Sequence, residues 1–561
     1  MKFNRILALL LVVLLCFSAA VPALAAKKDP GGEAYPTIYI YGKTDDLYNN
    51  IGTEEEYMIS NSSRVWSRSV PDTGEYAKEQ AKILLPKFAK ALFTGDYEDW
   101  ATECSAVLAP IYEDFVLDKN GKPREGSGVK SWEISDLKQP DGTFPMPEGL
   151  DYESSNDYFY RFHWDWRLSP LDVADSLRDF IEVVLQKTGT KKINLISRCE
   201  GCCVALAYLY KYGKEKKLFT NVLLGSSANG VCYASNIFAG KYEITADNLN
   251  RYIGHNFATG ADKSFGDDFV EDAFLRAYLR ESLCLLAESH SLDRLISLLR
   301  KLVKKVSPMI YPGLMMSSYG TCPAYWAMVR DEDYEDAKKL AGLTDNPEWA
   351  NFVALIDEYH YNVQQKSNKL LKLLQKRGAN TAIICKYGSE TLPFVEVADE
   401  PSDNTTLLKD ASYGATVAKI EAPFSDDYVN AAAKAGKSAY ISPDRLVDAS
   451  TCLFPERTWF LKYQDHDDWV NIMLAIYRTF IRSKGTMQIG DKYGFARFYV
   501  RDGQRYAVMT EENANLHSDY YQSGVKNVFR AWLASLFALL RHLPALLGAK
   551  IQEKLPVKLG A

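Results

Sequence analysis

The sequence predicts an α/β fold in which helices cover both faces of a mostly parallel sheet. Short runs of β-branched and aromatic residues are typical of buried strands, and segments with apolar residues at helical spacing follow them. Strands are expected at residues 35–41, 158–166, 192–197 and 219–225, and helices at residues 171–187 and 201–212. Strands that alternate with helices pair in parallel, because each helix returns the chain to the same end of the sheet.

The alternation of strands and helices stops in the middle of the chain. From about residue 240 to 376 only helical periodicity is found, which indicates a large helical insertion, either a lid or a stabilising cap. The sheet resumes with strands at residues 381–386 and 458–463, separated by a polar loop of about 70 residues, and a helix at residues 469–482. Residues 497–510 alternate around an Asp-Gly pair, which predicts a hairpin.

The N-terminus has the three parts of a secretory signal peptide. Lys2 and Arg5 form a short basic start, residues 6–16 are an apolar run, and residues 23–25 (Ala-Leu-Ala) fit a small-residue cleavage site. We therefore expect these first residues to be removed and the protein to be secreted. The alternative is an uncleaved membrane anchor.

The expected organisation has five segments. They are a signal peptide at residues 1–26, the first part of the α/β core at residues 27–239, a helical cap or lid at residues 240–376, the second part of the core at residues 377–485, and a C-terminal hairpin and amphipathic helix at residues 486–561. Residues 525–547 in the last segment are strongly apolar with interspersed basic side chains. Pro544 interrupts this stretch, so packing on the domain is the preferred interpretation, and contact with a lipid interface is the alternative.

Composition narrows the class of protein. Apolar residues make up 47% and charged residues 25% of the chain, as in ordinary globular proteins. A net charge of -6 over 561 residues argues against a nucleic-acid-binding protein. Outside the signal peptide the chain has nine cysteines, an odd number. We expect mostly buried single thiols, with at most one or two disulfides, because a chain of this size needs no disulfide framework.

A candidate nucleophile lies between a short buried strand and a helix. Cys199 has Ser197 two residues before it and Gly201 two residues after it. A nucleophile elbow places its reactive residue on a sharp turn between strand and helix, and the flanking positions must be small because the turn brings them against neighbouring backbone. A cysteine at this place faces the positive end of the helix dipole, which favours the thiolate.

The same turn supplies donors for an oxyanion. We expect the backbone N–H groups of Glu200 and of a residue in the loop after Gly42, near Lys43, to bind the oxyanion of a tetrahedral intermediate. Two other interpretations of Cys199 stay open, a buried inert cysteine and a redox pair with Cys202, which follows at C-x-x-C spacing. A zinc knuckle would need a second cysteine pair at similar spacing, and the sequence has none, so neither a metal nor a cofactor is expected.

The region around this turn resembles a known family. Asp165, Trp166 and Arg167, then a helix, a glycine and the strand–turn–helix run 193–212, resemble the lecithin:cholesterol acyltransferase-like branch of the α/β-hydrolases, as does the stretch 323–328 more weakly. The resemblance covers residues 155–230 and, in the same order, parts of 310–330 and 380–480. It implies the α/β-hydrolase fold.

The elbow departs from the pattern of that family. The family usually has glycine-histidine-serine-methionine-glycine-glycine, whereas this chain has Ser-Arg-Cys-Glu-Gly-Cys at residues 197–202, so cysteine replaces the nucleophilic serine. The glycine-rich oxyanion loop of the family is replaced by Gly-Lys-Thr-Asp at residues 42–45. Cysteine nucleophiles are known on this fold, for example in dienelactone hydrolases.

In this fold the nucleophile comes first in the chain, the acid second and the histidine base third. His466 directly follows the last predicted core strand, and the other histidines lie before the elbow, in the helical insertion or in the tail. For the acid we favour Asp444, which lies 22 residues before His466, as in the acid segment of the family. Asp403, nearer to the preceding strand, and Asp448 are the alternatives.

The resemblance implies a secreted acyl hydrolase or acyltransferase, similar to lipases, esterases and thioesterases, with a Cys-His-Asp triad. Its substrate would be a small acyl ester or a lipid, and no nucleic acid partner is expected. One alternative is a catalytically degenerate α/β-hydrolase that acts as a binding or interaction protein. The other is a thiol-redox role of Cys199 and Cys202.

Overall fold

The computed structural model describes most of the chain between residues 35 and 515. The described residues are 35–42, 47–49, 65, 73–128, 159–214, 217–242, 245, 248, 293–389, 395, 397, 399–467, 470–483, 485–502 and 505–515. The contact pattern separates residues 1–35 from residues 36–561, and the fold reported below is that of the second unit. The expected signal peptide, Lys43 and the apolar stretch 525–547 lie outside the described residues.

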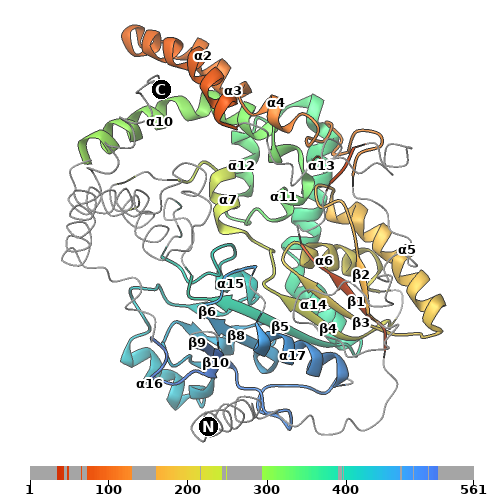
Figure 1. Cartoon of the computed structure of the whole chain (residues 1–561). Helices are drawn as coiled ribbons and strands as arrows, with labels where there is room; N and C mark the ends of the chain where they lie inside the picture. Colours follow the sequence, from red (N-terminus) through yellow and green to blue (C-terminus); the bar gives the residue numbers. More distant parts are fainter. Residues whose placement is uncertain are drawn as a thin grey trace, which may run out of the picture. The chain divides into compact units, whose positions relative to one another are not determined.

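The centre of the fold is an eight-stranded sheet, with strand order β10-β9-β8-β5-β4-β3-β1-β2 in the described part of the chain (Figure 1). Its strands are β1 (Thr37–Ile40), β2 (Phe159–Phe162), β3 (Ile193–Arg198), β4 (Phe219–Gly225), β5 (Asn380–Tyr387), β8 (Thr458–Lys462), β9 (Phe498–Asp502) and β10 (Arg505–Val508). All neighbouring strands are parallel except β9 and β10. The predicted fold class, a mostly parallel α/β sheet of the α/β-hydrolase type, is confirmed.

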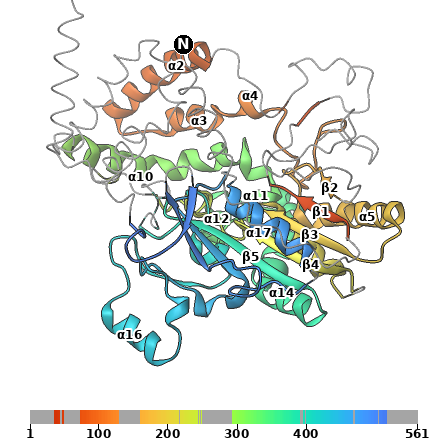
Figure 2. The same cartoon turned by 60° about the horizontal axis from the view of Figure 1, so that its bottom comes forward.

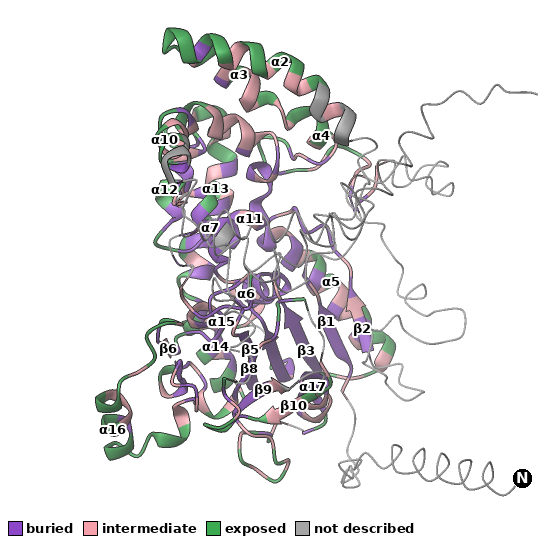
Figure 3. Cartoon of the chain, turned by 60° about the vertical axis from the view of Figure 1, so that its left-hand side comes forward, coloured by how far each residue is buried: buried purple, intermediate pink, exposed green. Residues whose placement is uncertain are grey.

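Helices cover both faces of this sheet. On one face lie α5 (Pro170–Thr188), α6 (Gly201–Tyr212) and α14 (Ser367–Lys376), and on the other lies α17 (Asn471–Arg482). Successive strand residues point to opposite faces. In β3, for example, Leu195 belongs to the core under α5 and α6, whereas Ile196 belongs to the core under α17. Both faces are therefore apolar, which explains why the strands are continuous apolar runs in the sequence (Figure 3).

The expected helical insertion is helical in its described part. Residues 293–376 contain α10 (Asp293–Met316), α11 (Pro323–Ala327), α12 (Tyr334–Leu340), α13 (Ala350–Tyr359), a π-helical turn (His360–Gln364) and α14. Two helices between β1 and β2, α2 (Thr73–Thr94) and α3 (Glu98–Ala106), join this layer, since α10 packs along α3 (Figure 2). The described helices lack the combination of length and apolar character that crossing a membrane requires.

The two remaining parts of the chain differ from the expectation. The stretch between β5 and β8, expected as a polar loop, holds α15 (Leu408–Ala411), β6 (Thr416–Val417), α16 (Asp426–Lys434) and β7 (Val447–Asp448). The hairpin that we expected in a C-terminal appendage extends the main sheet, because β9 pairs in parallel with β8 and buries Phe498 and Val500. The remaining α-helices of the described residues are the short α4 (Ala109–Tyr112) and α7 (Cys232–Phe238).

The segment that carries the family resemblance forms a buried junction. Arg167 makes two hydrogen bonds to the Asp165 carboxylate, at 3.0 and 2.7 Å, and donates a third to the Phe115 carbonyl at 2.9 Å. Trp166 between them is fully buried. Because Phe115 belongs to the segment that follows α4, Arg167 connects the chain after β2 to the chain that follows the helices α2 to α4.

We predict that Arg167→Ala lowers the free energy of unfolding by about 3–5 kcal/mol, because it leaves a buried carboxylate without its partner. Arg124→Ala, which breaks the exposed ion pair with Asp114, is the matched control and should cost less than about 1 kcal/mol. Urea unfolding followed by circular dichroism measures both. Equal losses in the two variants would contradict the role given to the buried pair.

Candidate active site

The sharp turn predicted at Cys199 is present at the junction of β3 and α6. Cys199 has a backbone φ of 54°, a left-handed conformation that is unfavourable for a residue with a side chain. The turn is held by its neighbours: the Cys199 N–H donates to the Gly225 carbonyl at 3.1 Å, and its carbonyl accepts from the Ala228 N–H at 3.2 Å. Strained backbone that is held in this way is typical of functional sites.

The small residues around the turn are required by close packing. A Cβ on Gly201 would lie 2.5 Å from the Ile40 carbonyl oxygen, and a Cβ on Gly42 would lie 2.9 Å from the Cys199 sulfur. Ser197 is completely buried. The end of β1 therefore lies directly against the elbow, and the Cys199 side chain keeps part of its surface accessible.

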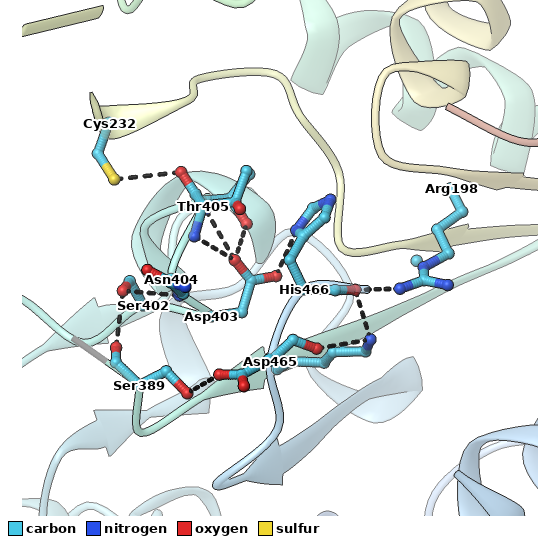
Figure 4. Close-up of polar contacts among 12 residues, drawn as sticks. Arg198, Cys232, Ser389, Ser402, Asp403, Asn404, Thr405, Asp465 and His466 are labelled. Atoms are coloured by element: carbon cyan, nitrogen blue, oxygen red, sulfur yellow. Dashed lines mark hydrogen bonds and ion pairs between the residues drawn. The ribbon is translucent and has the colours of Figure 1, made fainter. Parts of the chain in front are cut away.

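His466 and Asp403 meet at the carboxyl ends of the strands. The Nδ1 atom of His466, which follows β8, lies 2.8 Å from Oδ2 of Asp403 (Figure 4). The His466 N–H donates to the Asp403 carbonyl at 2.9 Å, so backbone and side chain of the two residues are paired. The other carboxylate oxygen of Asp403 accepts hydrogen bonds from the N–H and the hydroxyl of Thr406, at 2.7 and 2.9 Å. These hydrogen bonds hold the Asp403 carboxylate in the orientation in which it contacts the imidazole.

The preference for Asp444 as the acid is corrected by these contacts. Asp444 is buried elsewhere, where it pairs with Lys462 at 2.9 Å and accepts a hydrogen bond from the Tyr387 hydroxyl at 3.0 Å. Asp448, the third candidate, accepts from the Tyr428 hydroxyl at 2.9 Å. Asp403 takes the place beside His466 because the chain after β5 turns back on itself through the bridge between Ser389 and Ser402.

The three side chains shift one another's pKa. Burial opposes ionisation of Asp403, but the His466 imidazolium and the Thr406 N–H lower the pKa of its carboxyl to about 2. Burial also opposes protonation of His466, yet the Asp403 carboxylate and the Cys199 thiolate raise the pKa of the imidazole to about 10. Burial would raise the pKa of the Cys199 thiol, and His466 is the main group that holds it below its ordinary value. Each of these shifts favours the ionised form of its group.

One of the two expected oxyanion donors can be placed. The Glu200 N–H lies at the start of α6 and is one of the groups that hold the pKa of the Cys199 thiol below its ordinary value. A Cβ on Gly42 would lie 3.3 Å from the Glu200 nitrogen, so the end of β1 and the start of α6 converge at this donor. Lys43, expected to supply the second donor, lies outside the described residues.

The geometry does not favour a redox pair. Cys199 and Cys202 are both free thiols. The Cys202 sulfur lies 3.9 Å from the Gly225 carbonyl oxygen, and burial raises the pKa of its thiol to about 12. A thiol that stays protonated at neutral pH is a poor partner for exchange with Cys199. The described cysteines are single thiols, as expected, and the described residues contain no cluster of side chains suited to a metal ion.

Two buried cations near His466 were missed from the sequence. The Lys386 ammonium, on β5, donates to the main-chain carbonyls of Asp465 at 3.0 Å and of His466 at 2.7 Å. The Arg198 guanidinium, on β3, also donates to the His466 carbonyl. A lysine at the end of an apolar strand was the only signal for Lys386, since lysine is rarely buried without a specific partner.

Comparisons with known proteins add little to this description. No family model matches the chain, and no curated protein matches it. One similar solved structure is the crystal structure of the Tle4–Tli4 complex, with 15% sequence identity over 63% of this chain and 74% of the other chain and a TM-score of 0.20. A likeness at this level carries no argument about function, and the fold assignment rests on the order of the strands and on the elbow.

We predict that Asp403→Asn slows alkylation of Cys199 by iodoacetamide by about tenfold at about pH 6. This change corresponds to a rise of about one unit in the pKa of the thiol. The reason is that an amide no longer stabilises the His466 imidazolium, which in turn stabilises the thiolate. Asp444→Asn, which also alters a buried carboxylate, is the control and should react at the wild-type rate. The reverse result, slow alkylation in Asp444→Asn alone, would restore Asp444 as the acid.

Proposed function

We propose that this protein is an acyl hydrolase or acyltransferase in which Cys199 is the nucleophile, His466 the general acid and base, and Asp403 the carboxylate that orients the imidazole. The observation that carries the proposal is the buried pair of Asp403 and His466, with Oδ2 and Nδ1 2.8 Å apart, together with the strained turn at Cys199, whose thiol pKa is lowered mainly by His466. The earlier expectation of Asp444 in the triad is replaced by Asp403.

The chemistry follows from the protonation states of the site. The Cys199 thiolate attacks the acyl carbonyl carbon, and the negative charge that moves to oxygen is stabilised by the Glu200 N–H. The His466 imidazolium then gives its proton to the leaving group as the bond to that group breaks, and a thioester on Cys199 remains. In the second half, neutral His466 takes a proton from water or another acceptor, which attacks the thioester and regenerates the thiolate.

A thiolate nucleophile also restricts the leaving group. The tetrahedral intermediate expels the less basic of its two leaving groups, and a cysteine thiolate is far less basic than an alkoxide. The intermediate therefore breaks down to products most readily when the leaving group is a thiolate or a phenolate. A more basic alkoxide leaves only if His466 transfers its proton to it fully. We infer that thioesters and activated esters are better substrates than simple alkyl esters of the same acid.

The remaining expectations belong to the same proposal. The pattern of residues 1–26 supports export of the protein, and the basic, apolar stretch 525–547 supports contact with a lipid surface. A small acyl ester or a lipid is the proposed substrate, and the mild negative charge supports the absence of a nucleic acid partner.

A panel of acyl esters and thioesters of increasing chain length tests this function. The wild-type protein should hydrolyse one or more of them, with thioesters and aryl esters ahead of alkyl esters of equal chain length. His466→Ala should lower kcat/KM by about 10²–10⁴-fold, the usual contribution of general acid–base catalysis. Cys199→Ala should abolish thioester formation, and full activity in this variant would overturn the proposal.

The pH profile of kcat/KM should be bell-shaped. Activity should rise with pH as the Cys199 thiol loses its proton, at a pH below the ordinary range of a free cysteine, because the pKa of this thiol is lowered. Activity should fall again near pH 10, where His466 loses the proton that the leaving group needs, because the pKa of its imidazole is raised to about 10. A profile whose rising limb follows an ordinary thiol would contradict the resting ion pair.

A further inference from the structure

The main chain of His466 is held from two sides by groups outside the triad. Its N–H donates to the Asp403 carbonyl, and its carbonyl accepts from Lys386 at 2.7 Å and from Arg198. Figure 4 shows Arg198 approaching this carbonyl, on the side of the residue opposite Asp403. The direction in which the imidazole leaves the backbone is therefore fixed by contacts to both ends of the residue.

The two cations come from different strands and reach the same face of the sheet. Side chains alternate along a strand, so Arg198 points to the same face as Ile196, and Lys386 to the same face as Ile384, which is the face covered by α17. Gly225 of β4 lies between the two strands, in register with Arg198 and Ile384. A Cβ at Gly225 would collide with the Tyr477 hydroxyl, so this glycine leaves room for the Tyr477 side chain beside Arg198.

The two buried cations at this place depend on specific partners. Lys386 and Arg198 are each 1% exposed, and removing a charged group from water is costly unless specific partners compensate. Arg198 obtains further contacts from Tyr41, whose hydroxyl lies 3.1 Å from the guanidinium and whose ring centroid lies 5.2 Å from it. The partners on the other side are the carbonyls of the segment that carries His466.

Building on the function proposed above, we propose that Lys386 and Arg198 are positioning residues of this site, which hold the backbone of His466 so that its imidazole stays against Cys199. Arg198 immediately precedes Cys199 in the chain, so its hydrogen bond ties the backbone of the nucleophile to that of the base. Lys386 ties the same carbonyl to β5, the strand that leads toward Asp403. The three members of the triad are thereby joined through two side chains that touch no substrate.

The positive charges of Arg198 and Lys386 also favour the ionised forms of Cys199 and Asp403. Arg198 contributes to the lowered pKa of the Cys199 thiol, after the larger effects of burial, His466 and the Glu200 N–H. Lys386 contributes to the lowered pKa of the Asp403 carboxyl, after burial, His466 and Thr406. The other titratable groups that interact with the Cys199 thiol are His466, Cys202 and Cys203, and Tyr39, Tyr41 and Tyr477 surround Arg198.

The test measures the acidity of Cys199 without relying on turnover. Alkylation of Cys199 by iodoacetamide is followed as a function of pH, with peptide mapping to identify the modified residue, in the wild type, Lys386→Met and Arg198→Gln. Each variant should react about tenfold more slowly than the wild type at about pH 6 and at the wild-type rate at about pH 10, where every variant is ionised. In an active enzyme, kcat should fall while KM stays unchanged.

Lys462→Met is the matched control. Lys462 is also a buried lysine that donates to a main-chain carbonyl, that of Ala514 at 2.8 Å, but it lies on β8 and pairs with Asp444. This variant should lose thermal stability and keep the wild-type pH profile of alkylation. A shift as large as that of Lys386→Met would show a general effect of removing a buried charge, and would overturn the proposal.

Two charge-retaining variants keep the proposal testable if the neutral variants do not fold. Arg198→Lys and Lys386→Arg preserve the charge but change the reach of the side chain, so each should show a smaller shift than its neutral counterpart. An unchanged pH profile in folded variants at both positions would overturn the proposal. The proposed function has a separate test, because it is contradicted if the wild type converts no acyl substrate. The shift in thiol acidity can still be measured in that case.

Discussion

The contact between the Asp403 carboxylate and Nδ1 of His466 is the interaction on which the candidate site depends. It fixes the orientation of a buried imidazole and favours its protonated form, and the imidazolium in turn favours the thiolate of Cys199. Burial opposes the charged form of both the histidine and the cysteine, and the carboxylate acts against this effect of burial. The reactive pair is therefore a consequence of where one aspartate is placed.

The fold supplies this placement through the ends of parallel strands. β3 leads into the strained turn at Cys199, β5 leads to the bridge between Ser389 and Ser402 that brings Asp403 back, and β8 leads to His466. The close approach of β1 at Gly42 and Gly201 holds the elbow in shape. In the helical insertion, α10 packs on α3, whereas α11 and α13 contribute Ala327 and Tyr359 to the core beside the sheet.

The sequence predicted those parts of the molecule that depend on local patterns. The core strands and helices follow from apolar periodicity, the turn at Cys199 from the small residues at 197 and 201, and His466 from its position after a buried strand. Asp444 was preferred to Asp403 because the spacing from His466 does not reveal how the chain folds back after β5. The hairpin of β9 and β10 was assigned to an appendage because strand pairing with β8 is a long-range contact.

The most direct test of this account is the detection of an acyl group on Cys199 itself. The protein is exposed briefly to an aryl ester or a thioester, quenched in acid and examined by peptide mass spectrometry. The account predicts one acyl group on the peptide that contains Cys199, which hydroxylamine removes and which is absent from Cys199→Ala. Consumption of the ester with the acyl group on another residue, or with none on Cys199 at any time, would contradict it.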